Sequence, residues 1–488
     1  MVTTEELRER LAATHEWLLV REEGKTFPLL SSEIEISDGD GKRHFGFLDD
    51  KGFHNWRLNH AEVQGSELAI DVAGAFARGQ ETFRLVPRTP ASELAAEIEL
   101  ARLQLANDVA KLIVDNFPAA RLGRVALSAE NGRLALIEFD DVDKTPLAAM
   151  ADITAKLAPE IIMTHAILWL EKLAARKKKP VRKLWLIAEK RQARALQKLH
   201  ALLTDHRKTS IGIYSIDRKT DPPRLTELPS RTVRELFREK PPKLILPASL
   251  ETTRTAAKIL ELAPEAIDII VTRQGETLRF NGLPFARVRT MMGVEKAWFG
   301  SSRVMHPLND ASWEHLEVLV DELKFNRSDE APNRRHQLYR TAPEAWLESI
   351  LRRNIKLLDA NLILSPIYNQ FRFVRDKIDL LALRRDGRLV VIELKTQPDR
   401  AGVFQAADYW RKIELQRRRG LLERADLFDG REILDKPALV YLAAPAWSFH
   451  RDFEFFARCL TSDIELWRFE LHEAWREEVR VISRLEYR

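Results

Sequence analysis

The sequence predicts an α/β protein with three recognisable parts. These are a C-terminal mixed sheet flanked by helices, an earlier degenerate copy of the same arrangement, and a small β-rich N-terminal module. From about residue 92 onward, helical periodicity alternates with short apolar runs, which is typical of sheets covered by helices. Three stretches of the two α/β units match at one constant offset, which indicates a duplication. Short alternating runs with turn residues precede residue 87, which is typical of antiparallel strands.

Composition narrows the class of protein. The chain has 488 residues, so three or four domains are expected. Its single cysteine, Cys459, excludes intrachain disulfides and multi-cysteine metal sites, and fits a reducing cytoplasm. The sequence contains no apolar run of about 20 residues and no signal-peptide core, so a cytoplasmic protein without a membrane span is expected. The net charge of +5 permits nucleic-acid binding without requiring it.

Four segments are predicted along the chain. Residues 1–90 contain an N-terminal helix, expected over 1–23, and the β-rich module. Residues 91–220 form the first α/β unit. A linker rich in proline, arginine and lysine and a mixed α/β segment without a legible motif occupy residues 221–330. The second α/β unit covers residues 331–488.

The two α/β units can be aligned without gaps at an offset of 255 residues. The matched stretches are 131–139 with 386–394, 183–188 with 438–443, and 211–214 with 466–469. In this alignment Asp379 meets Arg124, Lys395 meets Asp140, and Glu393 meets Glu138. The first copy therefore lacks the charged set of the second, and we expect it to be catalytically silent.

A hairpin in the second copy carries the candidate chemistry. Its two arms, within residues 376–395, are apolar on both faces, which predicts central strands of a covered sheet. Asp379, Glu393 and Lys395 lie at the ends of these strands. Burying such groups is costly unless they pair with each other or hold a cation.

The turn of this hairpin decides which side chains meet. A two-residue turn would place Asp379 opposite Leu394, on the wrong face of the sheet. A three-residue loop, with Gly387 in the left-handed conformation, places Asp379 across from Glu393. Two carboxylates about 5 Å apart repel each other, and a divalent cation removes that penalty. Hard oxygen ligands favour Mg²⁺ or Mn²⁺. Such a metal with Lys395 beside it suits phosphodiester hydrolysis.

The order of these residues resembles the PD-(D/E)XK nuclease superfamily, and most closely its RecB-like and NucS-like branch. The matching residues are Leu347 and Glu348 on the leading helix, Gln370, the strands 378–382 and 391–395, and Gln405 with Tyr409 on the following helix. The match covers about residues 340–445. No proline precedes Asp379, where the superfamily's nominal motif has one.

The resemblance implies a restriction-endonuclease-like fold and the roles of further residues. Glu348 would support the metal or the attacking water. Gln370, Gln405 and Tyr409 would contact the nucleic acid. The basic run Arg417-Arg418-Arg419, later on the helix of Tyr409, is a candidate for contacts with phosphates.

We therefore expect a metal-dependent endonuclease that acts on nucleic acid, and DNA is the expected substrate. One centre per chain predicts nicking by a monomer, and cutting both strands would need a homodimer. Two alternatives stay open. One is a nucleic-acid-binding protein that kept the fold without useful activity, and the other is a defence component that cuts only when a partner protein triggers it. Glu344 is an alternative to Glu348 for the same role. Glu393 and Lys395 could instead form an ordinary ion pair. Gln405 and Tyr409 could instead be packing residues.

Overall fold

The structure is a computed structural model. It describes residues 3–21, 26–39, 41–49, 52–73, 80–88, 91–141, 143–241, 251–272, 275–291, 293–300, 305–365, 372–373, 376–377 and 379–487. The chain divides into two compact units, Met1–Gln104 and Leu105–Arg488. Helix α2 (Ala91–Asn116) contains the boundary between them. No helix within these described ranges is long and apolar enough to cross a membrane.

The first unit is a seven-stranded antiparallel sheet with one short helix against it. Its elements are α1 (Thr4–Ala12), β1 (Glu16–Arg21), β2 (Thr26–Leu30), β3 (Ile34–Gly39), β4 (Lys42–Asp49), β5 (Gly52–Gln64), β6 (Glu67–Ala73) and β7 (Gln80–Pro87). The β-rich module is thus confirmed. The helix predicted over 1–23 is wrong in its second half, because β1 buries Trp17 and Leu19 with a period of two.

The first α/β copy is a six-stranded sheet with its strands in chain order. These strands are β8 (Arg121–Leu127), β9 (Leu134–Asp140), β10 (Pro146–Asp152), β11 (Leu184–Glu189), β12 (Ile211–Asp217) and β13 (Arg224–Leu228). The helices are α3 (Pro159–Ala174), α4 (Lys190–His200), α5 (Asp205–Ser210) and α6 (Val233–Leu236). The sheet extends past the predicted domain boundary at residue 220, because β13 pairs with β12.

The second α/β copy has the same topology. Its six-stranded sheet has the order β19 (Leu362–Leu364), β22 (Leu380–Arg384), β23 (Leu389–Leu394), β24 (Leu439–Pro445), β25 (Glu465–Leu471) and β26 (Val481–Tyr487). The helices are α10 (Pro343–Arg353), α11 (Gly402–Arg417), α12 (Leu421–Arg424) and α13 (Phe453–Ala457), and β20 (Arg372–Phe373) pairs with β21 (Asp376–Lys377). From the first strand to the last, both sheets pair antiparallel, antiparallel, parallel, parallel and antiparallel.

This shared topology supports the duplication but corrects its alignment. The offset of 255 holds for β11 and β24, whereas β23 corresponds to β10 rather than to β9. The register shows this directly, because Ala148 of β10 pairs with Leu184 while Val390 of β23 pairs with Leu439. In this register Glu393 corresponds to Ala151.

The corrected alignment changes the counterparts of the other two charged residues as well. Because Ala151 pairs with Ala135 across β9 and β10, the counterpart of Asp379 is Ala135. Lys395 lies two residues after Glu393, so its counterpart is Ile153. The predicted counterparts Arg124, Glu138 and Asp140 are therefore wrong, and the first copy retains none of the three charges at these positions.

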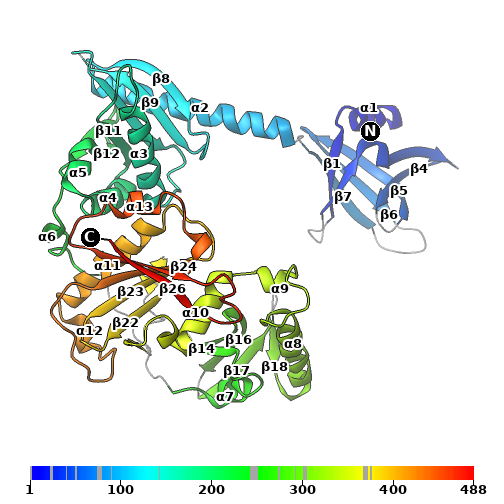
Figure 1. Ribbon diagram of the computed structural model, residues 1–488. Coiled ribbons are helices and arrows are strands. Elements are labelled where there is room, and N and C mark those ends of the chain that lie inside the picture. The colour runs from blue at the N-terminus through cyan, green and yellow to red at the C-terminus, as the bar shows by residue number, and fades with distance from the viewer. Residues whose placement is uncertain are drawn as a thin grey trace. The chain divides into compact units, whose positions relative to one another are not determined.

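The two copies share one hydrophobic core. It is built from apolar residues of both, with helices α3, α4, α11 and α13 between the two sheets (Figure 1). Leu203 and Leu460, which occupy similar places in the two copies, form an isolated antiparallel bridge. The Thr204 N–H donates to the Cys459 carbonyl at 2.9 Å, and the Thr461 N–H donates to the Leu202 carbonyl at 2.8 Å. The copies therefore pack as an internal pair.

Between the copies in sequence lies a third folded segment with a core of its own. It is a five-stranded antiparallel sheet with two longer helices. Its elements are α7 (Arg254–Leu260), β14 (Ile267–Thr272), β15 (Gly275–Phe280), β16 (Leu283–Met291), β17 (Val294–Phe299), β18 (His306–Leu308) and α8 (Trp313–Asn326), followed by α9 (Gln337–Arg340). The predicted mixed α/β segment is thus an antiparallel sheet with helices.

Candidate active site

The β22–β23 hairpin has the three-residue loop that the sequence predicts. The Arg384 N–H donates to the Arg388 carbonyl at 2.8 Å, and Gly387 has a φ of 83°. The register pairs Leu380 with Ile392. The three-residue loop and the register that it sets are confirmed. Asp379 lies one residue beyond the last pair of this register, and its charge acts on Glu393, so the two carboxylates lie near each other at this end of the hairpin.

Glu393 and Lys395 form a buried pair at the end of β23. Their exposed fractions are 3% and 9%. Lys395 Nζ lies 2.9 Å from Glu393 Oε1 and 3.2 Å from Asp399 Oδ2. The other oxygen, Glu393 Oε2, is buried without a hydrogen-bond partner. Asp379 is half-buried, and its Oδ2 accepts a hydrogen bond of 2.9 Å from the Leu394 N–H.

The ionisation of this pair follows from burial and from neighbouring charge. Burial raises the pKa of Glu393 well above its ordinary value, and the negative charge of Asp379 raises it further, against the opposing effect of Lys395. Burial acts to lower the pKa of Lys395, but Glu393 and Asp399 outweigh it and raise that pKa above its usual range. Lys395 therefore stays protonated, and positive charge placed next to Glu393 would favour its ionised form.

A cavity of about 430 Å³ lies next to Asp379, whereas Glu393 and Lys395 are not among the residues that line it. It is lined by Ala342, Pro343, Glu344, Ala345, Glu348, Asp379, Thr396 and Gln397. Asp379 reaches it from the hairpin, and Glu344 and Glu348 reach it from α10, so both rival glutamates line the same cavity. Glu348 is only 1% exposed, so it is not a solvated helix residue.

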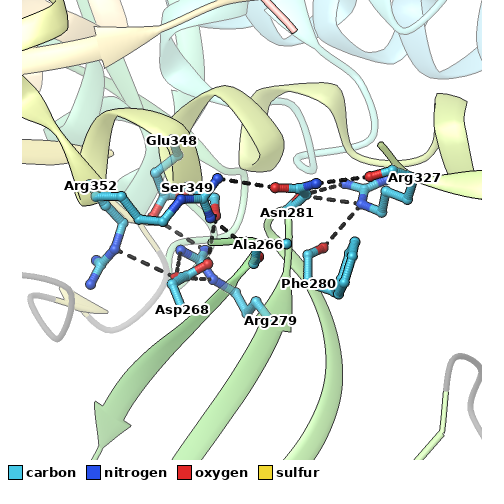
Figure 2. A network of polar contacts seen from close by, with 10 residues as sticks. Ala266, Asp268, Arg279, Phe280, Asn281, Arg327, Glu348, Ser349 and Arg352 are labelled. Carbon is cyan, nitrogen blue, oxygen red and sulfur yellow. Dashed lines mark hydrogen bonds and ion pairs between the residues drawn. The ribbon is translucent and has the colours of Figure 1, made fainter. Parts of the chain in front are cut away.

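Glu348 belongs to a buried polar network that joins α10 to the five-stranded sheet (Figure 2). Arg279 on β15 lies 3.3 Å from Glu348 Oε1 and donates to Asp268 at 3.0 and 2.6 Å. Ser349 Oγ donates to the other oxygen of Asp268 at 2.6 Å. Arg352 Nε lies 3.7 Å from the same carboxylate. The acid that faces the cavity is thus oriented by an arginine from another part of the chain.

Close backbone packing supports this junction. Gly282, in the turn between β15 and β16, has a φ of 81°, and a Cβ there would lie 2.0 Å from the Ala345 carbonyl oxygen. Arg327 fills the adjoining space and donates to the carbonyls of Phe280 and Asn281 at 3.2 Å (Figure 2). Only glycine allows the sheet to approach α10 so closely.

Sequence reasoning missed Arg279 and Asp268. One signal was present, since the two residues are direct cross-strand partners of opposite charge. Their link to Glu348 crosses 69 residues of sequence and leaves no local pattern.

The donor set suits a hard divalent cation. Asp379 and Glu393 supply carboxylate oxygens on one face. Glu393 Oε2 and Thr396 Oγ1 are both buried without hydrogen-bond partners, and such oxygens are costly unless a ligand or cation satisfies them. Among the described residues, no group of three or more His, Cys, Asp or Glu side chains is already arranged to hold a metal ion. The candidate centre thus rests on two carboxylates and neighbouring oxygens.

Helix α11 begins next to Lys395, because a Cβ on Gly402 would lie 3.3 Å from Lys395 Cε. Gln405, one turn later, is half-buried with its Oε1 lacking a partner. Tyr409 is 9% exposed and belongs to the core that joins the two copies, with Lys412 Nζ 5.3 Å from its ring centre. Its surroundings therefore match the packing alternative, while Gln405 lies at the helix end that borders the site.

The side chains of the basic run at the end of α11 mostly contact other groups of the protein. Arg417 donates to the buried Glu414 at 2.8 Å and also pairs with Asp435. Arg418 contacts Glu414 at 3.3 Å and covers the Phe237 ring, whereas the Arg419 guanidinium donates to the Arg238 carbonyl at 3.5 Å. These contacts hold the helix end in place. Gln370, the other predicted nucleic-acid contact, lies outside the described residues.

Comparisons with known proteins give little further information. No family model matches the chain, and no curated protein sequence matches it. One solved chain is similar, a structure of EndoMS in its apo form, with 13% sequence identity over an alignment that covers 40% of this chain and 91% of that chain. The TM-score is 0.16, so the similarity carries no argument about function. The proposals below rest on the residues of this chain.

Proposed function

We propose that this protein is a metal-dependent nuclease of the PD-(D/E)XK type, with its centre at Asp379, Glu393 and Lys395. The observation that supports the proposal is the hairpin register, whose next step beyond Leu380 and Ile392 would bring the two carboxylates to one face of the sheet, with the buried Lys395 ammonium group beside Glu393. The resemblance of the ordered residues to that superfamily supports the same conclusion.

Each residue has a role that follows from its surroundings. Asp379 and Glu393 would hold Mg²⁺ or Mn²⁺, which when bound polarises a phosphoryl oxygen and acidifies water. Lys395, which stays protonated, stabilises the negative charge that develops on the phosphate and orients the attacking water. Glu348, held by Arg279 at the cavity, accepts a hydrogen bond from that water. DNA is the proposed substrate, and the reaction is cleavage within the strand.

A plasmid cleavage assay tests this function. We expect the full chain to convert supercoiled DNA to nicked circles with Mg²⁺ or Mn²⁺ and not with EDTA. Asp379→Asn, Glu393→Gln and Lys395→Ala should each lower the rate by roughly 100-fold or more, because each removes a group that acts on the reacting phosphate. The matched control is Asp435→Asn, whose side chain is 98% exposed near the hairpin's turn, at the other end of β23. Full cleavage by Lys395→Ala would refute the proposal.

The same assay separates the two alternatives. A protein that only binds nucleic acid would give no metal-dependent product with any substrate. A chain that cuts only when a partner triggers it would be inactive alone and active after a cell extract is added, with that activity lost in Glu393→Gln.

A further inference from the structure

A large groove lies between the two α/β copies, away from the candidate active site. Its volume is about 1000 Å³. Most of its lining comes from the silent copy, from the loop after β10 and from α4, and the remainder comes from α11. The charged lining residues are Lys156, Lys190, Arg191, Arg194, Lys198, Arg411 and Lys412 against Glu160, Glu189 and Asp408. Positive charge therefore predominates.

Several of these charges are already neutralised within the protein. Asp408 holds both Arg411 and Lys412 at 2.7 Å, and all three side chains are buried. Lys198 pairs with Glu239 at 2.7 Å. Glu189 pairs with Arg218 at 2.7 Å.

The remaining basic residues on the groove differ from these. Lys156, Lys190, Arg191 and Arg194 are exposed, and none has an acidic partner within the described part of the chain. Three of them, Lys190, Arg191 and Arg194, lie on the first two turns of α4, at a helix end whose backbone N–H groups also favour anions. Four basic side chains with no acidic partner among the described residues thus line one surface.

The wall of the groove is held rigidly. Asp152, which is 8% exposed, accepts hydrogen bonds from the Leu157 N–H at 2.7 Å and from the Gln192 side chain at 3.0 Å. Gln192 also donates to the Leu157 carbonyl at 3.1 Å. These bonds fix the backbone of the loop after β10 to α4, so the backbone positions that carry the basic side chains are set before any ligand arrives.

The position of this loop in the fold is informative. It is the counterpart of the loop that follows Lys395, which lines the candidate active site in the other copy. The counterparts of the two candidate acids, Ala135 and Ala151, do not line the groove, so the groove shares only this loop with the candidate active site.

We propose that this groove binds the phosphate backbone of a nucleic acid, and that the silent copy serves the chain as a binding platform. The proposal rests on the proposed nuclease function for the identity of the substrate. Repeated phosphates are the ligand that matches several unneutralised lysine and arginine side chains along one wall of the groove. The lining residues within the described ranges include no aromatic side chain. Binding should therefore depend on charge and not on base sequence.

The test measures binding without cleavage. Fluorescence anisotropy in EDTA measures the affinity of the full chain for three labelled nucleic acids. These are a 30-base-pair duplex DNA, the corresponding single strand, and an RNA of the same length. The variant is Lys190→Gln with Arg191→Gln and Arg194→Gln. We expect roughly tenfold or more weaker binding at 0.1 M salt, and a slope of log affinity against log salt that is smaller by about three on duplex DNA.

A charge-matched control completes the design. Arg451→Gln, Arg458→Gln and Arg480→Gln remove the same charge from exposed residues that already have acidic neighbours. Equal losses in both triple variants, or an unchanged salt slope in the groove variant, would overturn the proposal. Poly-glutamate that binds as tightly as DNA would also overturn it. Weaker binding of the groove variant to both DNA and RNA would support recognition of the phosphate backbone. Weaker binding to only one of them would identify that nucleic acid as the ligand.

The outcome is independent of catalysis. Lys395→Ala, if it abolishes cleavage, should leave this binding intact. If the cleavage assay fails while the groove variant still loses affinity and salt slope, the nuclease proposal falls and the binding platform stands.

Discussion

At the scale of single residues, Glu393 is the most constrained group in the site. One oxygen is paired with Lys395, and the other is buried without a partner. A raised pKa in the folded state means that the native protein holds a proton that the unfolded chain has released. The stability that this group contributes is therefore complete below its unfolded pKa of about 4.5, and is lost as the pH rises toward the folded value.

This argument predicts a pH-dependent difference between two proteins. In EDTA, Glu393→Gln should be more stable than the natural chain at pH 8, and the difference should shrink toward pH 5, because the substitution removes the cost of ionising a buried acid. Thermal unfolding at both pH values measures the effect. A difference that does not change with pH would contradict the assignment. Mg²⁺ should stabilise the natural chain and not the variant, because it binds the ionised carboxylate.

A second prediction concerns Arg279. Its removal takes a guanidinium group away from two buried carboxylates, Asp268 and Glu348, so Arg279→Gln should lower the free energy of unfolding in urea by about 3–5 kcal/mol. The exposed pair of Arg334 with Glu477 is the matched control, and Arg334→Gln should change stability far less. Similar costs for the two variants would show that the network in Figure 2 contributes little.

At the scale of elements, the β22–β23 turn determines whether the acids meet. Gly387 has a φ of 83°, and a Cβ there would lie 3.2 Å from the Glu432 carbonyl oxygen. We expect Gly387→Ala to destabilise the protein by about 1–2 kcal/mol. Gly387→Asn should cost less, because asparagine adopts left-handed backbone angles more readily. Chemical denaturation of both variants separates the conformational cost from the steric cost, which they share.

The sequence predicted this hairpin well because its signals are local. Alternating faces, the Asp386-Gly387 pair and the apolar arms all lie within about twenty residues of each other. Elements whose identity depends on distant partners were predicted less well. The stretch from Glu16 to Arg21 becomes a strand because it pairs with β2 and β7, which helical periodicity could not reveal.

The same limit explains the error in aligning the copies. Residues 131–139 resemble 386–394 because both follow a polar turn with apolar strand residues, a pattern that any hairpin can show. Only the pairing partners distinguish β9 from β10. The candidate acids and lysine were found from their own strand, whereas Arg279 could be connected to Glu348 only through the folded structure.

At the scale of the whole molecule, the chain has one complete candidate centre in a paired architecture. We therefore predict that nicked circles precede linear plasmid, and that the initial rate of nicking rises in proportion to protein concentration. A rate that rises with the square of the concentration would instead indicate a homodimer as the active species. Glu393→Gln mixed with natural protein provides the control, because it should not inhibit a monomeric enzyme.

The common core of Figure 1 makes a further prediction about cooperativity. Apolar helix faces from both copies cover each other, so neither copy should keep its fold when the other unfolds. Near-UV circular dichroism and intrinsic fluorescence should report a single shared transition for the two α/β copies in urea. Two separate transitions would contradict this.

The bridge between Leu203 and Leu460 has a consequence for how such a protein could change over time. Residues of the first copy whose side chains meet water can be substituted with little effect on the fold. Residues of the core that the two copies share are constrained, because a loss there would expose apolar surface of both copies. The outer face of the first copy is thus the part of this pair most open to substitution.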